Sequence, residues 1–105
     1  MNEVIYLNQE DFEAEVINSR VPVLVQFSSV LCGPCNAMKP TLEELAADLG
    51  DTGKVFVVEI SVNQRLAEEF KVVALPTLAI FRGGREINRM VGMKTKESLL
   101  EALAA

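Results

Sequence analysis

The stretch VPVLVQFSSVLCGPCNAMKP, from Val21 to Pro40, contains the features that decide the fold. Its first part, Val23 to Phe27, is short, rich in β-branched residues and almost wholly apolar, which predicts a central strand buried on both faces. After the two cysteines the apolar positions alternate in spacing between three and four, as in a helix; they are Cys35, Met38, Leu42, Leu45 and Leu49. Pro40 lies inside that helix and should bend it, because proline lacks a backbone donor.

The segments on both sides of this stretch predict alternating strands and helices. A strand is expected from Val4 to Leu7, and a helix capped by Asn8 should follow it with Phe12, Val16 and Ile17 on its apolar face. The later elements are a strand from Val55 to Ile60, a helix capped by Asn63, a strand from Thr77 to Phe81, a hairpin turn at Gly83-Gly84, a strand through Ile87 and Val91, and a helix capped by Thr95.

The predicted order is therefore β-α-β-α-β-α-β-β-α. Strands that alternate with helices imply a parallel portion of sheet, and the glycine hairpin adds an antiparallel edge. We expect an α/β protein with a mixed five-stranded sheet flanked by four helices. The chain has no linker, repeat or low-complexity tract, so we expect residues 1–105 to form a single domain.

Composition narrows the possible partners and the compartment. A net charge of −5 argues against nucleic acid and anionic membrane, since both favour basic patches. The N-terminus has no basic and apolar run typical of a signal peptide, and no apolar stretch approaches the roughly 20 residues that cross a bilayer. We therefore expect a cytoplasmic protein, in which a structural disulfide would be unusual. We also expect the protein to be a monomer.

The two cysteines stand at the position where a strand ends and a helix begins. Unpaired backbone donors at a helix start favour a thiolate, so Cys32 is the expected nucleophile. Pro34 suits the first helical turn, and Gly33 leaves room for an incoming disulfide. Cys35, one turn further on, should face inward. Cys32 can then attack a substrate disulfide, and Cys35 can resolve the mixed disulfide without any bound cofactor.

Three other interpretations stay open. The pair could be two buried cysteines that act as small hydrophobic residues. It could supply half of a zinc or iron–sulfur site, although the chain has no other Cys and no His, so only a dimer could complete four ligands. The chain could also be a binding or adaptor module with weak turnover. A Cys–His hydrolase is excluded because no His can act as its base.

Together these features resemble the thioredoxin family over nearly the whole chain. The resemblance rests on Cys32-Gly-Pro-Cys35, Pro40, the Leu75-Pro76-Thr77 tripeptide and Gly92. It implies a thioredoxin fold, reduction of protein disulfides and a thioredoxin-reductase-type electron donor. It also implies a cis Leu75–Pro76 bond beside the cysteines and a docking surface that consists of Leu31, Gly33, Val73, Ala74, Leu75 and Gly92.

The chain departs from that family at several positions around the cysteines. Leu31 and Ser28 stand where the family has tryptophans, and Asn36 replaces a basic residue. Gln26 and Val57 occupy the positions of a buried Asp and a Lys on neighbouring strands. The Gln26 amide cannot accept the proton that the Cys35 thiol must lose before it attacks. We therefore expect Cys35 to resolve the mixed disulfide more slowly, or to transfer its proton to water or to the departing thiolate. Glu59 is a possible substitute acceptor, although its position favours a simple strand-end charge.

Overall fold

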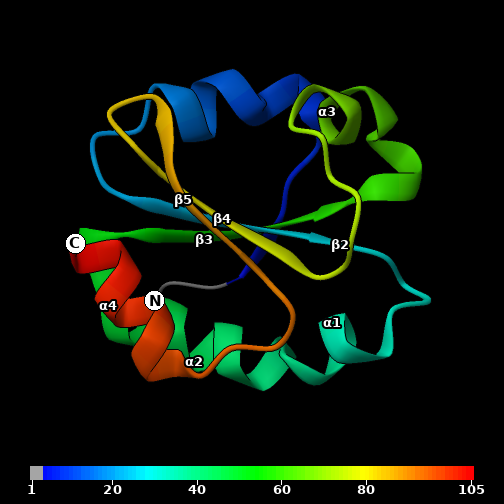
Figure 1. Cartoon of the computed structure of the whole chain (residues 1–105). Helices are drawn as coiled ribbons and strands as arrows, with labels where there is room; N and C mark the ends of the chain where they lie inside the picture. The colour runs from blue at the N-terminus through cyan, green and yellow to red at the C-terminus, as the bar shows by residue number, and fades with distance from the viewer. Residues whose placement is uncertain (1–3) are drawn as a thin grey trace.

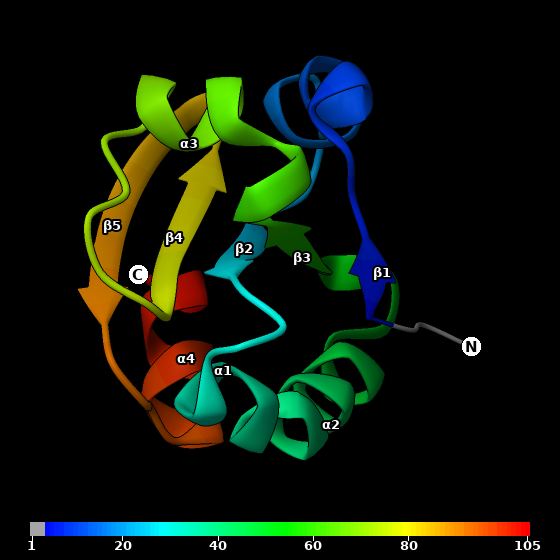
Figure 2. The same cartoon turned by 90° about the vertical axis from the view of Figure 1, so that its right-hand side faces the viewer.

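Five strands form one mixed sheet in the computed structural model, which describes residues 4–105. The spatial order is β1-β3-β2-β4-β5, as Figure 2 shows. The strands are β1 (Ile5–Tyr6), β2 (Val23–Ser28), β3 (Lys54–Glu59), β4 (Thr77–Arg82) and β5 (Arg85–Val91). β1 and β2 run parallel to β3, whereas β4 runs antiparallel to β2 and to β5. The predicted mixed five-stranded sheet is confirmed.

Helices cover both faces of this sheet (Figure 1). One face carries α1 (Gly33–Ala37), α2 (Lys39–Leu49) and α4 (Lys96–Ala104). The other carries α3 (Gln64–Glu69), a 3-10 turn η1 (Gln9–Asp11) and a π-helical turn η2 (Glu13–Ile17). Two further 3-10 turns, η3 (Gly50–Thr52) and η4 (Ile60–Val62), flank β3. The element order agrees with the prediction, except that the first helix consists of a 3-10 turn and a π turn.

Each face of the sheet has its own apolar core. Beneath α2 and α4, both strands and helices contribute aliphatic side chains, among them Leu24, Leu42, Leu78 and Leu99. The opposite core, called the aromatic core below, combines aliphatic side chains with phenylalanines, of which Phe12, Phe27, Phe70 and Phe81 pack with ring centroids 5.3 to 6.3 Å apart. β2 is buried along its whole length, because both cores rest on it. This central strand therefore provides a rigid support for the loop that follows it.

The single helix expected after Cys35 is divided in two at Met38, which is the C-cap of α1 and the N-cap of α2 and keeps right-handed helical dihedral angles. Pro40 was expected inside a helix but lies in the first turn of α2, where its missing N–H needs no partner. The interruption at Met38 separates a short helix that carries the cysteines from a longer helix that anchors in the core.

Two of the three predicted asparagine and threonine caps are wrong. The side chain of Asn8 makes no capping bond to η1, and that of Asn63 makes none to α3. Asn63 is instead buried between segments, where its Oδ1 accepts a hydrogen bond from the Gln9 N–H at 2.7 Å and its Nδ2 donates to the Glu59 carbonyl at 2.8 Å. Thr95 does cap α4, because its Oγ1 accepts from the Ser98 N–H at 3.2 Å.

Candidate active site

Cys32 and Cys35 lie at the start of α1, directly after the loop that leaves β2. The two residues form a disulfide with their Cα atoms 5.3 Å apart. Cys32 is the N-cap of α1, and its Sγ accepts a hydrogen bond from the Cys35 N–H at 3.2 Å. Cys32 is half-buried, whereas Cys35 is only 3% exposed and faces inward as predicted. An incoming disulfide can therefore reach Cys32, while Cys35 is reached only from inside the site.

Several hydrogen bonds fix the conformation of the loop that precedes α1. The Leu31 N–H donates to Ser29 Oγ at 3.1 Å, and the Cys32 N–H donates to the Ser29 carbonyl at 3.0 Å. Asn36 donates from Nδ2 to the Val30 carbonyl at 3.2 Å. These bonds leave the Leu31 side chain 91% exposed beside the cysteines. In the sequence, nothing pointed to this role of Asn36.

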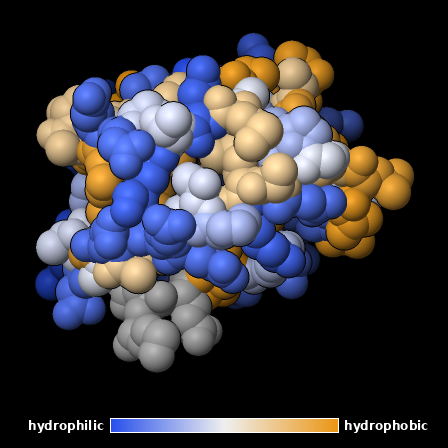
Figure 3. Space-filling model, turned by 90° about the horizontal axis from the view of Figure 1, so that it is seen from below, coloured by the Kyte–Doolittle hydropathy of each residue, from blue (hydrophilic) through white to orange (hydrophobic). Residues whose placement is uncertain are grey.

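Apolar side chains gather on the surface at this end of the molecule. Figure 3 shows hydrophobic surface at its right-hand end, where the loop before α1 lies in Figure 1. Val30 is also largely exposed, at 71%. Gly33 is exposed as well, and a Cβ added there would meet no atom within 4 Å. The space above Gly33 is thus open, which agrees with access for a substrate disulfide.

The segment before β4 lies close to the start of α1 in both views (Figures 1 and 2). Its Leu75–Pro76 bond is cis, as the resemblance implied. The Gly92 N–H donates to the Pro76 carbonyl at 2.9 Å, so the end of β5 lies beside this segment. Val73 is 94% exposed and Ala74 is exposed, whereas Leu75 is half-buried. The predicted docking residues therefore come from three segments of chain at one end of the sheet.

Behind the cysteines the interior is uncharged. Gln26 is 2% exposed, and its Nε2 approaches the Cys35 carbonyl at 3.5 Å and Met38 Sδ at 3.9 Å. Val57 is its direct neighbour on β3. Among residues 4–105 the buried polar side chains are all neutral: Gln26, Ser28, Asn63 and Thr77. A buried amide bonded in the core is thus confirmed for Gln26.

Glu59 lies at the end of β3, beside Ser28. Its carboxylate accepts hydrogen bonds from the Ser61 N–H at 3.2 Å and from Ser61 Oγ at 2.7 Å. The carboxylate therefore caps the short turn η4. This contact favours the interpretation of Glu59 as a strand-end charge.

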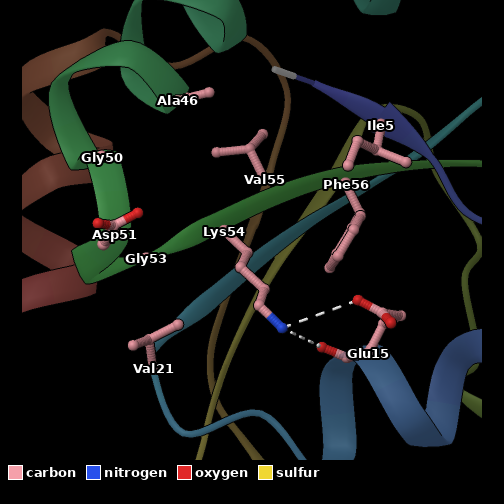
Figure 4. A pocket seen from close by; sticks show the side chains of 10 residues that line it. All are labelled: Ile5, Glu15, Val21, Ala46, Gly50, Asp51, Gly53, Lys54, Val55 and Phe56. Atoms are coloured by element: carbon pink, nitrogen blue, oxygen red, sulfur yellow. Dashed lines mark hydrogen bonds and ion pairs between the residues drawn. The ribbon is translucent and has the colours of Figure 1, made fainter. Parts of the chain in front are cut away.

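A surface pocket lies away from the cysteines (Figure 4). It has a volume of about 340 Å³ and adjoins Lys54, the first residue of β3, whose Nζ lies 3.8 Å from Glu15 Oε1. β3 is parallel to β2, and Cys32 follows the far end of β2. Neither cysteine nor any predicted docking residue lines this pocket. The candidate site at the cysteines is therefore separate from this pocket.

Comparison with known proteins agrees with this geometry. The family model described as Thioredoxin matches residues 3–105. The chain belongs to the thioredoxin family. It is 38% identical to a thioredoxin of Mycolicibacterium smegmatis over 102 residues, which are 95% of this chain and 91% of that protein. It is 35% identical to a thioredoxin of Haemophilus influenzae over 99 residues, which are 94% of this chain and 92% of that protein.

A third relative joins two activities in one polypeptide. It is a bifunctional thioredoxin reductase/thioredoxin of Mycobacterium leprae, and it is 39% identical to this chain over 100 residues. The aligned residues are 95% of this chain but only 22% of that larger protein. Thioredoxins work through their own disulfide, act on disulfide substrates and are reduced by thioredoxin reductase. With its Cys32–Cys35 pair, this member of the family is a thiol-disulfide oxidoreductase.

Residues 4–105 contain no group of three or more His, Cys, Asp or Glu placed to hold a metal ion. None of the helices in this part of the chain is both long and apolar enough to span a membrane.

Proposed function

We propose that this thioredoxin-family protein works as a reductase of protein disulfides, with Cys32 as the nucleophile and Cys35 as the resolving thiol. The observation that carries the assignment is the 3.2 Å hydrogen bond from the Cys35 N–H to Cys32 Sγ. A donor directed at sulfur favours the thiolate, which is the attacking species. The unequal exposure of the two cysteine residues supports the same order, because Cys32 is half-buried and Cys35 is fully buried.

The reaction takes place in two exchanges. The Cys32 thiolate attacks one sulfur of a substrate disulfide, so a mixed disulfide forms and one substrate thiolate leaves. The Cys35 thiolate then attacks Cys32 Sγ, which forms the intramolecular disulfide and releases the second substrate thiolate. The substrate gains two electrons, and the protein's dithiol loses them. A thioredoxin-reductase-type donor would restore the dithiol, with no separate cofactor in this chain.

The docking surface would consist of Leu31, Gly33, Val73, Ala74, Leu75 and Gly92, with Pro76 and Pro34 shaping the site. An extended substrate segment can pair with exposed backbone groups as an added strand. Gln26 would shape the site from behind, through its contact with the Cys35 carbonyl. We further propose that the protein acts as a cytoplasmic monomer on protein substrates, and not on nucleic acid or at a membrane.

Reduction of insulin by dithiothreitol tests this proposal. Wild type should accelerate the reaction, Cys32→Ser should not, and Cys35→Ser should accumulate a mixed disulfide visible in a mass spectrum. If wild type and Cys32→Ser give equal rates, the chain is a binding module on a thioredoxin fold and the reductase assignment fails. Equilibration with glutathione then fixes the direction, since about −270 mV marks a reductant and about −120 mV a strong oxidant.

A further inference from the structure

A β-bulge in β5 changes which face its side chains point to. Ile80 is opposite Asn88 and Phe81 is opposite Glu86, so Ile87 is the extra residue in the ladder. Residues three apart in a regular strand point to opposite faces. The extra residue places Glu86 and Arg89 on the same face, the one covered by α3, because their partners Phe81 and Ala79 both belong to the core beneath that helix.

The two side chains form a partly buried ion pair that orients the guanidinium. Arg89 Nε lies 2.6 Å from Glu86 Oε2, and Nη2 lies 3.0 Å from Oε1, which is a bidentate arrangement. The Arg89 side chain is 31% exposed and that of Glu86 is 23% exposed. The pair holds the remaining donors of Arg89 in one direction. They point to the chain that leaves α3.

Two backbone carbonyls directly after α3 face these donors. Arg89 Nη2 donates to the Phe70 carbonyl at 2.6 Å, and Nη1 approaches the Lys71 carbonyl at 3.5 Å. Lys71 adopts a left-handed conformation with φ of 53°, which is unfavourable for a residue with a Cβ. The Val72 N–H closes the turn on the Ala67 carbonyl at 2.9 Å. The hydrogen bonds from Arg89 on β5 thus stabilise the strained turn at Lys71.

This turn is one of two anchors of the segment that carries the docking residues. The segment runs from Val72 to Leu75, and both of these side chains pack on the aromatic core. Between them Val73 and Ala74 project outward. At the far end, Thr77 Oγ1 donates to the Ala74 carbonyl at 2.6 Å. The position of Val73 therefore depends on the turn at Lys71 on one side and on β4 on the other.

We propose that Arg89, oriented by Glu86, is a positioning residue for substrate: it fixes the turn after α3 and so holds Val73 and Ala74 in place for docking. The hydrogen bonds of Arg89 go to Glu86 and to the carbonyls of Phe70 and Lys71, so it would act on substrate only through the turn. The inference rests on the proposed protein-disulfide reductase activity. It predicts that Arg89 matters for large substrates, which need the docking segment, and much less for small disulfides, which need only Cys32.

The test measures how fast the reduced form of the protein reduces two substrates. One is insulin, and the other is the small aromatic disulfide dithiobis(nitrobenzoate). In Arg89→Ala the second-order rate constant with insulin should fall about tenfold, through KM, as expected for loss of charge-assisted hydrogen bonds. The rate constant with the small disulfide should change less than about twofold. Arg89→Lys should show the same selective loss, because an ammonium cannot make the bidentate contact. Amide exchange at Val72 to Leu75 should quicken in both variants.

A matched control is Arg85→Ala, which removes an exposed arginine from the same strand and should leave both rates unchanged. If Arg89→Ala does not fold, Arg89→Lys decides the question. Equal changes with the two substrates, or no change with either, would overturn the positioning role. Loss of all exchange activity in the wild type would instead count against the proposed reductase function, so the two failures are distinguishable.

Discussion

Replacing Gln26 with aspartate would place a carboxyl group in the uncharged interior behind Cys35. Gln26 is 2% exposed, lies between Val57 and Leu78 on the neighbouring strands, and has Met38 Sδ 3.9 Å from its amide nitrogen. Burial without a cationic partner raises the pKa of a carboxyl group by about 3 units or more. At about 1.4 kcal/mol per unit, the ionised form should cost the fold about 4 kcal/mol.

The sign of the pH dependence follows from the raised pKa. The folded state holds the proton more tightly than the unfolded state, in which the aspartate pKa is about 3.9. The cost is therefore absent below about pH 3.9, grows as the pH rises toward the folded-state pKa, and is complete above it. Urea unfolding of Gln26→Asp at a series of pH values measures this loss. The expected loss of about 4 kcal/mol is a large share of the roughly 5–15 kcal/mol by which a typical domain is stable.

The same carboxylate should speed the resolution step. Above its folded-state pKa it can accept the proton of the Cys35 thiol, and general base catalysis contributes about 100-fold or more in favourable cases. We expect at least about a tenfold acceleration at about pH 8 and none at about pH 4, where the group is protonated. Stopped-flow release of the second thionitrobenzoate from the mixed disulfide with Cys32 measures this step.

Gln26→Asn is the matched control, since it has the size of aspartate and no charge. It should change neither the pH dependence of stability nor the resolution rate. Gln26→Asp combined with Val57→Lys should recover part of the lost stability, because the two positions are direct neighbours on β2 and β3. The reasoning is refuted if the aspartate and asparagine variants unfold alike at about pH 8 and resolve at the same rate.

Three further predictions concern stability and can be checked by urea unfolding. Thr95→Ala should lower the free energy of unfolding by about 1 kcal/mol through loss of the α4 cap, whereas Asn8→Ala should change it by less than about 0.5 kcal/mol. The hydrogen bond and charge of Asp48 raise the pKa of Lys96 above 10.5, so the stabilisation by Lys96 should be present below that pH and lost as the pH rises through the raised value. Lys96→Met should flatten the stability profile in that alkaline range. Lys71→Gly should raise the free energy of unfolding by about 1 kcal/mol, because glycine tolerates a positive φ; an unchanged or lower value would contradict the strain at that turn.

Much of the architecture was predictable from local patterns. The apolar run from Val23 to Phe27 is a central strand, and the alternating spacing after Cys35 is helical, although the helix is divided at Met38. The Gly83-Gly84 pair forms the expected hairpin, with φ of 61° and 81°. These patterns succeed because side-chain periodicity follows directly from backbone geometry, and a buried face must be apolar. For the same reason the placement of Cys32 at a helix start and of Cys35 inside was visible in the sequence.

Polar contacts between distant segments were not predictable in this way. Asn8 and Asn63 have the residue type and position of caps, yet Asn63 bonds to Gln9 and Glu59 and neither asparagine caps its own helix. Helix capping depends on local geometry, but a buried amide takes whichever donors and acceptors surround it in the fold. Only the assembled structure decides which segments those are.

The sequence by itself thus determined the central strand β2, the placement of the two cysteines after it, and the helical segment that follows. The signals for these features lie within a few neighbouring residues. The tertiary structure decided the surroundings of that centre: the bulge at Ile87 that aligns Glu86 with Arg89, and the contact of Arg89 with the end of α3. One extra residue in a strand reverses the facing of every residue beyond it. Its place depends on how β4 and β5 pair, which no local pattern records.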